Sequence, residues 1–318
     1  MNELPLVSIV IPVFNGSNFM AEAIDSALAQ AYPNIEILVI NDGSSDEGAT
    51  HKIALSYGDK IKYFEKKNGG VASALNLGIK EMNGKYFSWL SHDDVYKSHK
   101  IQTQVDYLET NENIGACYSN YDVIDEYSNF VKSVNVQWFP GKKALLELFG
   151  NGYINGCSLL ISKTIFDKVG LFNEELLYSQ DIEMWIRILN ETTIGKVEEN
   201  LFFEREHKNQ GSIKFNKEVK EEVKQMYSEI FISLSIYEHL NAHNYSQNQK
   251  IANGFLWLGD RLARYRGDYI GALFFYQQSL NQWDSMYNKA RIRKLLGQKG
   301  LFFYFGSLKA VHLIKKAF

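Results

Sequence analysis

The first hundred residues of this 318-residue chain alternate between two hydrophobic patterns, and this alternation narrows the choice of fold most. Short runs rich in β-branched residues occur at 7–13 and 35–40, as expected for strands buried on both faces of a sheet. Residues 61–64 and 86–90 predict two further strands. Segments of helical length separate the strands, at 17–30, 46–57 and 71–82. A repeated strand–helix order requires right-handed crossovers and gives a mostly parallel sheet flanked by helices, so we expect an α/β fold.

The pattern changes twice after residue 97. A helix near 97–109 is followed by mixed strands around 115–123 and 158–161, and another helix begins near Asp181. Beyond residue 216 the strand pattern disappears and the remainder is typical of helix. We therefore expect an α/β domain over residues 1–215, with halves of about 1–110 and 111–215, and a smaller all-helical domain over 216–318.

Residues 257–280 resemble one helical hairpin of the tetratricopeptide type. A single unit cannot form a solenoid, which needs about three repeats. The hairpin is therefore either an accessory helical pair packed on the first domain or part of a peptide-binding surface.

Composition excludes several classes of protein. Hydrophobic residues make up 45% of the chain and charged residues 22%, which is ordinary for a globular protein and unlike a disordered or fibrous one. The formal net charge of -3 argues against general nucleic-acid binding. Cys117 and Cys157 are too few for a disulfide framework and predict buried thiols in a reducing compartment. No signal peptide and no run of about 20 apolar residues is found, so we expect a cytoplasmic protein.

The C-terminal segment is basic, because eight positive side chains and no acidic ones follow Asp284. Residues 299–318 combine lysines with a cluster of aromatic residues. This segment is either an interfacial helix on an anionic membrane surface, peripheral to the inner face of the cell membrane, or an apolar part of the helical domain's core.

Carboxylates follow two of the predicted strands, and ligands of open α/β sheets bind beyond the carboxyl ends of strands. Asp42 follows the second strand, where it can accept hydrogen bonds from a base or a ribose, or cap the next helix. Asp93 and Asp94 follow the fourth strand. Adjacent carboxylates repel each other, and a divalent cation that also binds a diphosphate would relieve the repulsion. The glycine-rich fingerprints of dinucleotide-binding and P-loop proteins do not occur.

These segments resemble the motifs of the family 2 glycosyltransferases, which have the GT-A fold and use nucleotide-sugar donors. The matching motifs extend from residue 7 to about 212, in the family's order. They are a first strand ending at Asn15, a nucleoside-binding turn at Asp42, a glycine-containing loop at 68–78, an acidic turn at Asp93 and Asp94, an acceptor-side motif at Asp181, and a closing loop at Arg205 and His207. The match is a variant at two positions. Ser91 stands where the family's D-x-D element begins, and Leu75 stands where many members carry a basic residue.

The resemblance also implies roles for particular residues. It implies that Asp94 binds Mn²⁺ or Mg²⁺ with help from His207, that Asp93 contacts the ribose or the donor sugar, and that Asp181 is the catalytic base. His207 is alternatively an ordinary loop histidine, and an aspartate at position 181 can also be a helix N-cap. The implied donor-binding residues are Pro12, Phe14, Asn15, Asp42, Asn68, Gly69, Asn76 and Asp93.

We therefore expect an inverting, metal-dependent hexosyltransferase. It would move a sugar from a nucleoside-diphosphate sugar, with UDP as the default, to a hydroxyl of a glycan or lipid-linked acceptor in the synthesis of a cell-envelope polysaccharide. A metal-dependent sugar nucleotidyltransferase is a second hypothesis, although the loop after the first strand lacks the basic residues that it would need. A non-catalytic scaffold that binds partners through its helices is a third, and the intact carboxylates argue against it.

Overall fold

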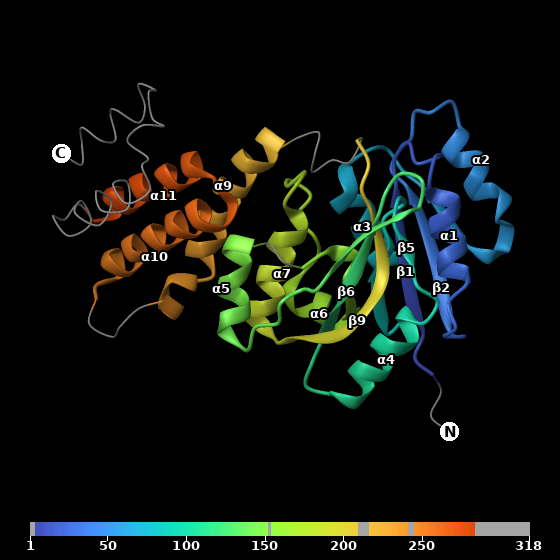
Figure 1. Ribbon diagram of the computed structural model, residues 1–318, viewed down its shortest axis with the longest axis horizontal. Helices are drawn as coiled ribbons and strands as arrows, with labels where there is room; N and C mark the ends of the chain where they lie inside the picture. The colour runs from blue at the N-terminus through green and yellow to red at the C-terminus, as the bar shows by residue number, and fades with distance from the viewer. Residues whose placement is uncertain (1–3, 152–153, 209–215, 241–244, 284–318) are drawn as a thin grey trace. The chain divides into compact units, whose positions relative to one another are not determined.

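The computed structural model describes residues 4–151, 154–208, 216–240 and 245–283 (Figure 1). The chain forms two compact units, Met1–Ala144 with Tyr153–Phe215, and Leu145–Gly152 with Asn216–Phe318. Most of helix α5, Lys142–Asn151, belongs to the second unit, whereas the sequence-based division leaves it in the first domain. The basic segment 299–318 lies outside the described residues.

The first unit is built on a mixed sheet with the strand order β3-β2-β1-β4-β8-β6-β9-β5, and β7 pairs with β6. Its parallel half consists of β3 (Lys62–Glu65), β2 (Ile35–Asn41), β1 (Val7–Val13) and β4 (Tyr86–Trp89). Every residue of β1 is buried, which explains why its sequence is continuously apolar and does not alternate. The predicted α/β fold is confirmed.

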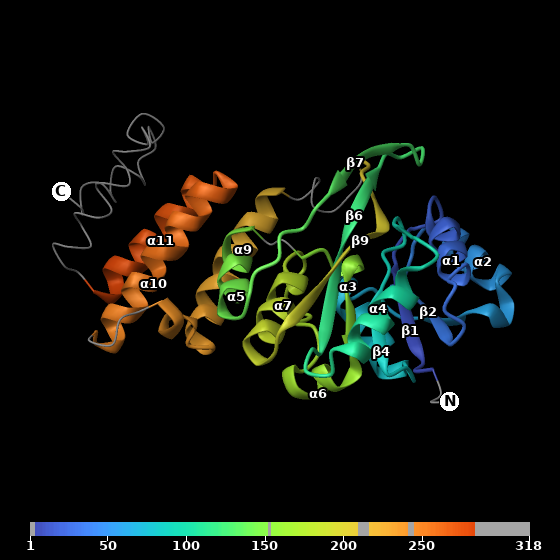
Figure 2. The ribbon, with the colours of Figure 1, turned by 60° about the horizontal axis from the view of Figure 1, so that its bottom comes forward.

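The other half of the sheet is mixed in direction. Strand β8 (Leu160–Ser162) runs antiparallel to both β4 and β6 (Ala116–Ile124). Strand β9 (Ile194–Arg205) is parallel to β6, and the short β5 (Val95–Tyr96) is antiparallel to β9. Strand β7 (Phe130–Val134) forms a hairpin with β6 (Figure 2). Because β5 follows β4 directly, its pairing with β9 brings the end of β9 beside the turn between β4 and β5.

Helices cover both faces of the parallel strands. Right-handed crossovers place α1 (Met20–Leu28) and α2 (Ala49–Ser56) on one face and α3 (Gly70–Glu81) on the other. Helices α1 and α2 lie side by side in both views (Figures 1 and 2). Helix α4 (Lys100–Thr110) packs on β6, β8 and β9. The remaining helical elements of this unit are α6 (Lys163–Val169), α7 (Gln180–Glu191) and the short 3-10 turns Gly58–Lys60 and Gly156–Ser158.

The described part of the second unit is helical, as the sequence predicts. It contains most of α5 together with α9 (Asn216–Ser233), α10 (Gln247–Arg261), α11 (Tyr269–Gln282), a 3-10 turn at Ile236–Leu240 and a π-helical turn at Leu262–Arg266. Helices α10 and α11 pack together as the predicted hairpin. The ring of Phe149 contacts the rings of Tyr227 and Phe231, with centroids 4.9 and 5.7 Å away. Within the described ranges, no helix combines the length and the apolar composition that a bilayer-spanning segment requires.

Candidate active site

The loops that follow the parallel strands are joined to one another at the carboxyl edge of the sheet, and we name loops 14–19, 42–48, 66–69 and 90–94 the strand-end cluster. Asn15, after β1, donates its backbone N–H to Ser44 Oγ at 2.9 Å, and its side-chain oxygen accepts the N–H of Ser45 at 2.7 Å. Asn15 has a φ of 51°, a left-handed conformation that asparagine adopts more readily than most residues. His92, after β4, lies against Gly16, since a Cβ on Gly16 would be 2.6 Å from an imidazole carbon.

Asp42 is the buried carboxylate of this cluster, with 3% of the residue exposed. Its Oδ1 accepts hydrogen bonds from Lys66 Nζ at 2.7 Å and from the N–H of Gly69 at 3.0 Å, and its Oδ2 accepts the N–H of Gly70 at 2.8 Å. The N-cap of α3 is Gly69, which has no side chain to cap the helix. The carboxylate of Asp42, in the loop after β2, therefore caps the N-terminus of α3. Three of the roughly four acceptor positions of a carboxylate are used, which leaves one for a ligand.

The turn after β2 requires a glycine at position 43. Its φ is +69°, and a Cβ there would be 2.6 Å from the backbone nitrogen of Asn68. The side chain of Asn68 donates to the carbonyl oxygen of Asp42 at 2.9 Å. Asn68 and Gly69 thus lie beside Asp42, as the predicted donor site requires, and both are exposed.

Pro12 lies within the last part of β1, and Phe14 follows the strand. Pro12 is buried within β1 opposite Ile40, at a central position of the sheet where proline is unusual because it has no N–H. The pairing of β1 with β4 reaches only Val10 and Trp89, so β4 requires no N–H from Pro12. Phe14 follows the strand and is 46% exposed, so its ring is available to a ligand at the cluster.

The turn between β4 and β5 carries Asp93 and Asp94. Asp94 is 5% exposed, and its Oδ1 accepts the backbone N–H of Arg205 at 2.9 Å. Burial and the charge of Asp93 raise the pKa of Asp94 well above its ordinary value. Asp93 Oδ2 lies 2.9 Å from His207 Nε2. Burial alone would raise the pKa of Asp93, but the hydrogen bond to His207 and the charges of His92 and His207 lower it overall. Asp93 is therefore ionised, whereas Asp94 requires a proton or a cation.

Sequence reasoning missed Glu204, which lies beside this turn at the end of β9. Its Oε1 accepts a hydrogen bond from Asn155 Nδ2 at 3.0 Å. Burial, and then the charge of Glu206, raise the pKa of Glu204, and its own charge raises the pKa of Asp94. The sequence signal for Glu204 is its position immediately before the closing-loop residues, but only the pairing of β5 with β9 places it beside the turn that carries Asp94.

Cys157 is a second residue that the sequence did not assign to the site. Its Sγ accepts the N–H of Ser91 at 3.2 Å and donates to Ser91 Oγ at 3.2 Å. Burial, and then the charge of Asp94, raise the pKa of this thiol well above its ordinary value, so Cys157 stays protonated. Both cysteines of the chain are free and buried, as predicted.

Asp181 lies in the first turn of α7. The N-cap is Ser179, and Asp181 Oδ1 accepts the N–H of Ile182 at 2.7 Å, so Asp181 is not the N-cap residue. Glu183 forms a two-point ion pair with Arg187, with both distances 2.7 Å. This pairing engages the carboxylate of Glu183 and argues against Glu183 as a base.

A row of aromatic rings connects the strand-end cluster with α7. The ring of Phe172 is 6.3 Å from that of Trp89 at the end of β4 and 5.9 Å from that of Trp185, one turn beyond Asp181. Asn76 holds Phe172 in place, because its amide accepts the Phe172 N–H at 2.8 Å and donates to the Phe172 carbonyl at 2.9 Å. Asn76, which the resemblance places among the donor-binding residues, is thus buried and engaged with this loop, and the structure shows no surface of its amide for a donor.

Arg205 and Leu75 complete the set of sequence-assigned positions. Leu75 is fully buried in α3, so this position belongs to the hydrophobic core. The side chain of Arg205 is also fully buried, and its contacts are described below.

A divalent cation fits this site only in part. Among the residues that the structure describes, no three His, Cys, Asp or Glu side chains come together as a metal-binding group. Asp94 nevertheless has the property expected of a cation ligand, because a positive charge would offset the burial that raises its pKa. His207 is oriented by a carboxylate through one ring nitrogen, an arrangement typical of metal-binding histidines. These two residues fit a cation only if a diphosphate supplies further oxygen ligands.

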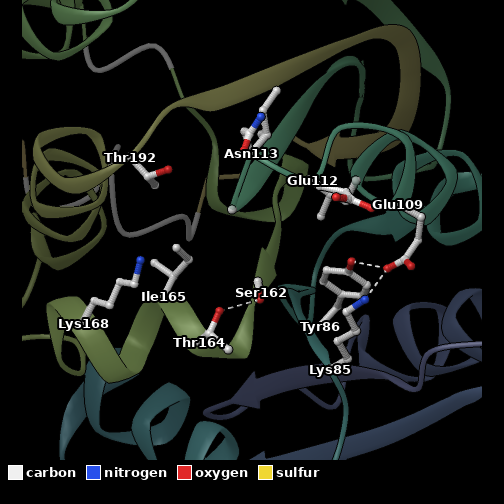
Figure 3. Close-up of a pocket in the computed structure, with 13 residues that line it drawn as sticks. Lys85, Tyr86, Glu109, Glu112, Asn113, Ser162, Thr164, Ile165, Lys168 and Thr192 are labelled. Atoms are coloured by element: carbon white, nitrogen blue, oxygen red, sulfur yellow. Dashed lines mark hydrogen bonds and ion pairs between the residues drawn. The ribbon is translucent and has the colours of Figure 1, made fainter.

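A separate hollow of about 370 Å³ lies in the first unit (Figure 3). Its lining includes Lys85 and Tyr86 at the start of β4, Ser162 at the end of β8, and Thr192 before β9. Glu109 pairs with Lys85 at 2.6 Å across one wall. Because the amino ends of β4 and β9 meet here, the hollow is at the edge of the sheet opposite the strand-end cluster, and it contains none of the predicted site residues.

Two thirds of the chain is similar in sequence to known glycosyltransferases. The chain is 51% identical over 218 residues to an uncharacterized glycosyltransferase of Rickettsia felis, a match that covers 67% of this chain and 36% of that protein. It is 29% identical over 214 residues to the Escherichia coli UDP-Glc:alpha-D-GlcNAc-diphosphoundecaprenol beta-1,3-glucosyltransferase WfgD, covering 67% of this chain and 81% of that enzyme.

Solved structures show the same fold. The crystal structure of S. aureus TarS 1-349 in complex with UDP-GlcNAc superposes with a TM-score of 0.60 at 15% identity, covering 90% of this chain and 83% of that one. The sequence profile of Glycosyl transferase family 2 matches residues 8–170, more than half of the chain. The resemblance found in the motifs is confirmed: the chain belongs to glycosyl transferase family 2.

Proposed function

We propose that this chain is an inverting glycosyltransferase that moves a sugar from a UDP-sugar to a hydroxyl of a lipid-linked glycan during the synthesis of a surface polysaccharide. The observation that supports it best is the strand-end cluster, in which the Asp42 turn and the Asp93–Asp94 turn share one edge of the sheet. The aromatic row then joins that edge to the helix that carries Asp181. The names of WfgD and of the TarS complex support a UDP-sugar donor, and WfgD supports a diphosphoundecaprenol-linked acceptor.

The nucleotide would bind against the loops after β1 to β3. Asp42 has one acceptor position left for a base N–H or a ribose hydroxyl, and the ring of Phe14 offers an exposed apolar surface. Lys66 brings a positive charge into this region, beside Asp42. The position at which many family members carry a basic residue is the buried Leu75. We propose that Lys66 supplies the missing cationic contact to the donor.

The leaving diphosphate requires neutralisation as its charge develops. Asp94 and His207 would hold Mn²⁺ or Mg²⁺, and such a cation would stabilise the departing diphosphate as a Lewis acid. The ionised Asp93 would accept a hydrogen bond from a sugar or ribose hydroxyl while His207 keeps it oriented.

The acceptor hydroxyl requires a base on the opposite face of the donor sugar. Asp181 would remove the hydroxyl proton as the oxygen attacks the anomeric carbon. One displacement of this kind inverts the configuration at that carbon.

The decisive experiment compares wild type with Asp181→Asn. Turnover is measured as UDP released from UDP-glucose or UDP-GlcNAc with a diphosphoundecaprenol-linked saccharide acceptor and Mn²⁺. Donor binding is measured as the thermal shift that each nucleotide sugar causes, since a bound ligand stabilises the fold by mass action. We expect the variant to lose turnover by about 100-fold or more, as for removal of a general base, and to keep its donor-dependent shift.

Two results would contradict the proposal. Near-normal turnover of Asp181→Asn would exclude Asp181 as the base. Release of pyrophosphate from a nucleoside triphosphate, with no nucleoside diphosphate formed from any nucleotide sugar, would identify a nucleotidyltransferase instead. The Glu183→Gln variant is a matched control on the same helix turn, and we expect it to keep most of the activity.

Metal dependence and membrane association are separate parts of the proposal. We expect excess chelator to abolish turnover and added Mn²⁺ or Mg²⁺ to restore it, and full turnover in chelator would exclude the metal role. For segment 299–318, flotation with anionic liposomes would compare the full chain with residues 1–298. Flotation of the full chain alone would support membrane binding, and equal behaviour of the two proteins would exclude it.

A further inference from the structure

Arg205 is the last residue of β9, and its side chain is one of the largest that the first unit buries completely. The closing-loop resemblance places this position near the donor diphosphate. In the structure, however, the guanidinium lies inside the protein, and each of its nitrogens donates to a protein oxygen. A buried arginine with these bonds cannot also be an exposed diphosphate ligand without breaking them.

Two of the hydrogen bonds of Arg205 fix the acidic turn directly. Its backbone N–H donates to Asp94 Oδ1 at 2.9 Å, and its Nε donates to the backbone carbonyl of Asp93 at 2.9 Å. The end of β9 therefore holds the carboxyl of one aspartate and the backbone of the other. His207, two residues further along, holds the Asp93 carboxylate.

The remaining nitrogens of Arg205 anchor it to two other elements. One terminal nitrogen donates to the Glu22 carboxylate on α1 at 2.6 Å. The other donates to Ser128 Oγ at 2.8 Å and to the Asp125 carbonyl at 3.3 Å, both in the β6–β7 hairpin turn. Ser128 Oγ in turn donates to Glu22 at 3.2 Å, which closes a ring of three side chains.

The ring of Phe19 covers the guanidinium, with the central carbon of Arg205 4.6 Å from the ring centroid. The same ring lies 5.2 Å from the imidazole of His207. Phe19 is the N-cap residue of α1, so this stacking ties the start of α1 to both closing-loop residues. Arginine suits this position better than lysine, because its planar fork can bond in several directions while its face stacks on an aromatic ring.

We propose that Arg205 is a positioning residue for the donor site: anchored by Glu22, Ser128 and Phe19, it sets the placement of the Asp93–Asp94 turn on which donor binding depends. This inference rests on the proposed function. A positioning role for Arg205 and a direct diphosphate-binding role predict different effects of substitutions at the residues that anchor Arg205. Glu22 and Ser128 bond Arg205 and not the Asp93–Asp94 turn, so their removal should weaken donor binding through Arg205.

The test uses the full-length protein with Arg205→Lys, Arg205→Met, Glu22→Gln and the double variant Arg205→Lys/Glu22→Gln. Donor KM and kcat are measured with the UDP-sugar that wild type uses, UDP binding is measured by calorimetry with Mn²⁺, and folding is measured by urea unfolding. Lys132→Met is the matched control, because Lys132 forms an exposed pair at 3.0 Å with Glu206, the neighbour of Arg205. We expect the control to match wild type in KM.

We expect Arg205→Met to raise the donor KM and the UDP dissociation constant by about tenfold, which corresponds to about 1.4 kcal/mol. Arg205→Lys should recover part of this loss, and Glu22→Gln should raise KM in the same direction. The double variant should be little worse than Arg205→Lys alone, because residues of one network give non-additive effects.

Several outcomes would overturn the inference. Wild-type donor KM in Arg205→Lys and Glu22→Gln would do so, whatever their urea midpoints, and these two variants decide the question if Arg205→Met fails to fold. A loss confined to the Arg205 variants, with Glu22→Gln unchanged, would identify a direct ligand. If wild type itself releases no UDP from any UDP-sugar, the proposed function fails, and UDP binding by the variants still tests the positioning role.

Discussion

Replacing Asp42 by alanine removes a buried carboxylate that connects three elements of the fold. Its oxygens accept two backbone N–H groups at the start of α3 and the ammonium of Lys66. Alanine leaves those donors without their partner in a region where only 5% of the Asp42 side chain and 20% of the Lys66 side chain are exposed. We expect Asp42→Ala to destabilise the first unit whether or not a donor is present.

The magnitude follows from the kinds of bond that are lost. Loss of a helix cap costs about 1 kcal/mol. Hydrogen bonds to charged groups contribute about 1.5–3 kcal/mol each, and breaking a fully buried ion pair costs about 3–5 kcal/mol. These energies cannot be added, because one carboxylate makes all the bonds. The partial exposure of Lys66 also lowers the cost, since water can solvate part of the ammonium that remains. We therefore expect Asp42→Ala to lower the free energy of unfolding by about 3 kcal/mol.

The assay is urea unfolding followed by tryptophan fluorescence, since Trp89 and Trp185 are both buried in the first unit. Lys66→Met is the comparison, because it removes the ammonium and leaves both backbone bonds of Asp42 intact. We expect it to cost about 1 kcal/mol or less, as for a partly exposed pair. The reasoning fails if Asp42→Ala costs under about 0.5 kcal/mol, the usual effect of an unremarkable surface substitution, or if Lys66→Met costs more than Asp42→Ala.

Three further predictions concern stability. Burial alone would raise the pKa of Glu36, but hydrogen bonds from Lys62 and its other partners outweigh it and lower the pKa from 4.5 to about 2. Stability from Glu36 is therefore present above pH 4.5 and lost as the pH falls toward 2, and acid titration should show this loss in wild type and not in Glu36→Gln. Burial lowers the pKa of Lys100 from 10.5 to about 7, so the folded state binds fewer protons than the unfolded state between these values. Wild type should gain stability relative to Lys100→Met as the pH rises from 7 to 10, by up to about 1.4 kcal/mol per pH unit, and parallel curves would contradict this. A Cβ on Gly78 would lie 2.3 Å from Val10 Cγ1, so Gly78→Ala should cost about 1–3 kcal/mol, and adding Val10→Ala should recover part of that loss in urea unfolding if the clash is the cause.

The parallel half of the fold could be predicted because its sequence pattern is local. Residues 7–13 and 35–40 coincide with β1 and all but the last residue of β2, since a strand buried on both faces must be apolar along its whole length. The site residues at these strand ends could be assigned for the same reason. The parallel arrangement brings every carboxyl end to one edge, so Asp42 and the Asp93–Asp94 turn had to lie on the same side of the sheet.

Strand β9 could not be predicted in this way. Its middle residues, Val197 to Leu201, include two exposed glutamates, and its burial follows neither a continuous nor an alternating pattern. The pairing of β9 with β6 also shifts register twice, which breaks the period of two. The closing-loop motif alone does not place Glu204 or Arg205 beside Asp94, because that placement depends on the pairing of β5 with β9.

The residues of the motifs are of two kinds. Some act in the site through their own side chains, and others use their side chains to hold the backbone of a neighbouring loop. A motif identifies both kinds of position but does not distinguish between them. The side chains of Asp93 and His207 pair with each other within the site. Asn76 also lies in a motif, but its amide hydrogen-bonds the backbone of Phe172. Arg205 is of the second kind as well, because it bonds the carbonyl of Asp93 and not its carboxylate. Substitutions at Asn76 and Arg205 should therefore change the geometry of the neighbouring loop first and ligand affinity only as a consequence, which is why their partners must be varied with them.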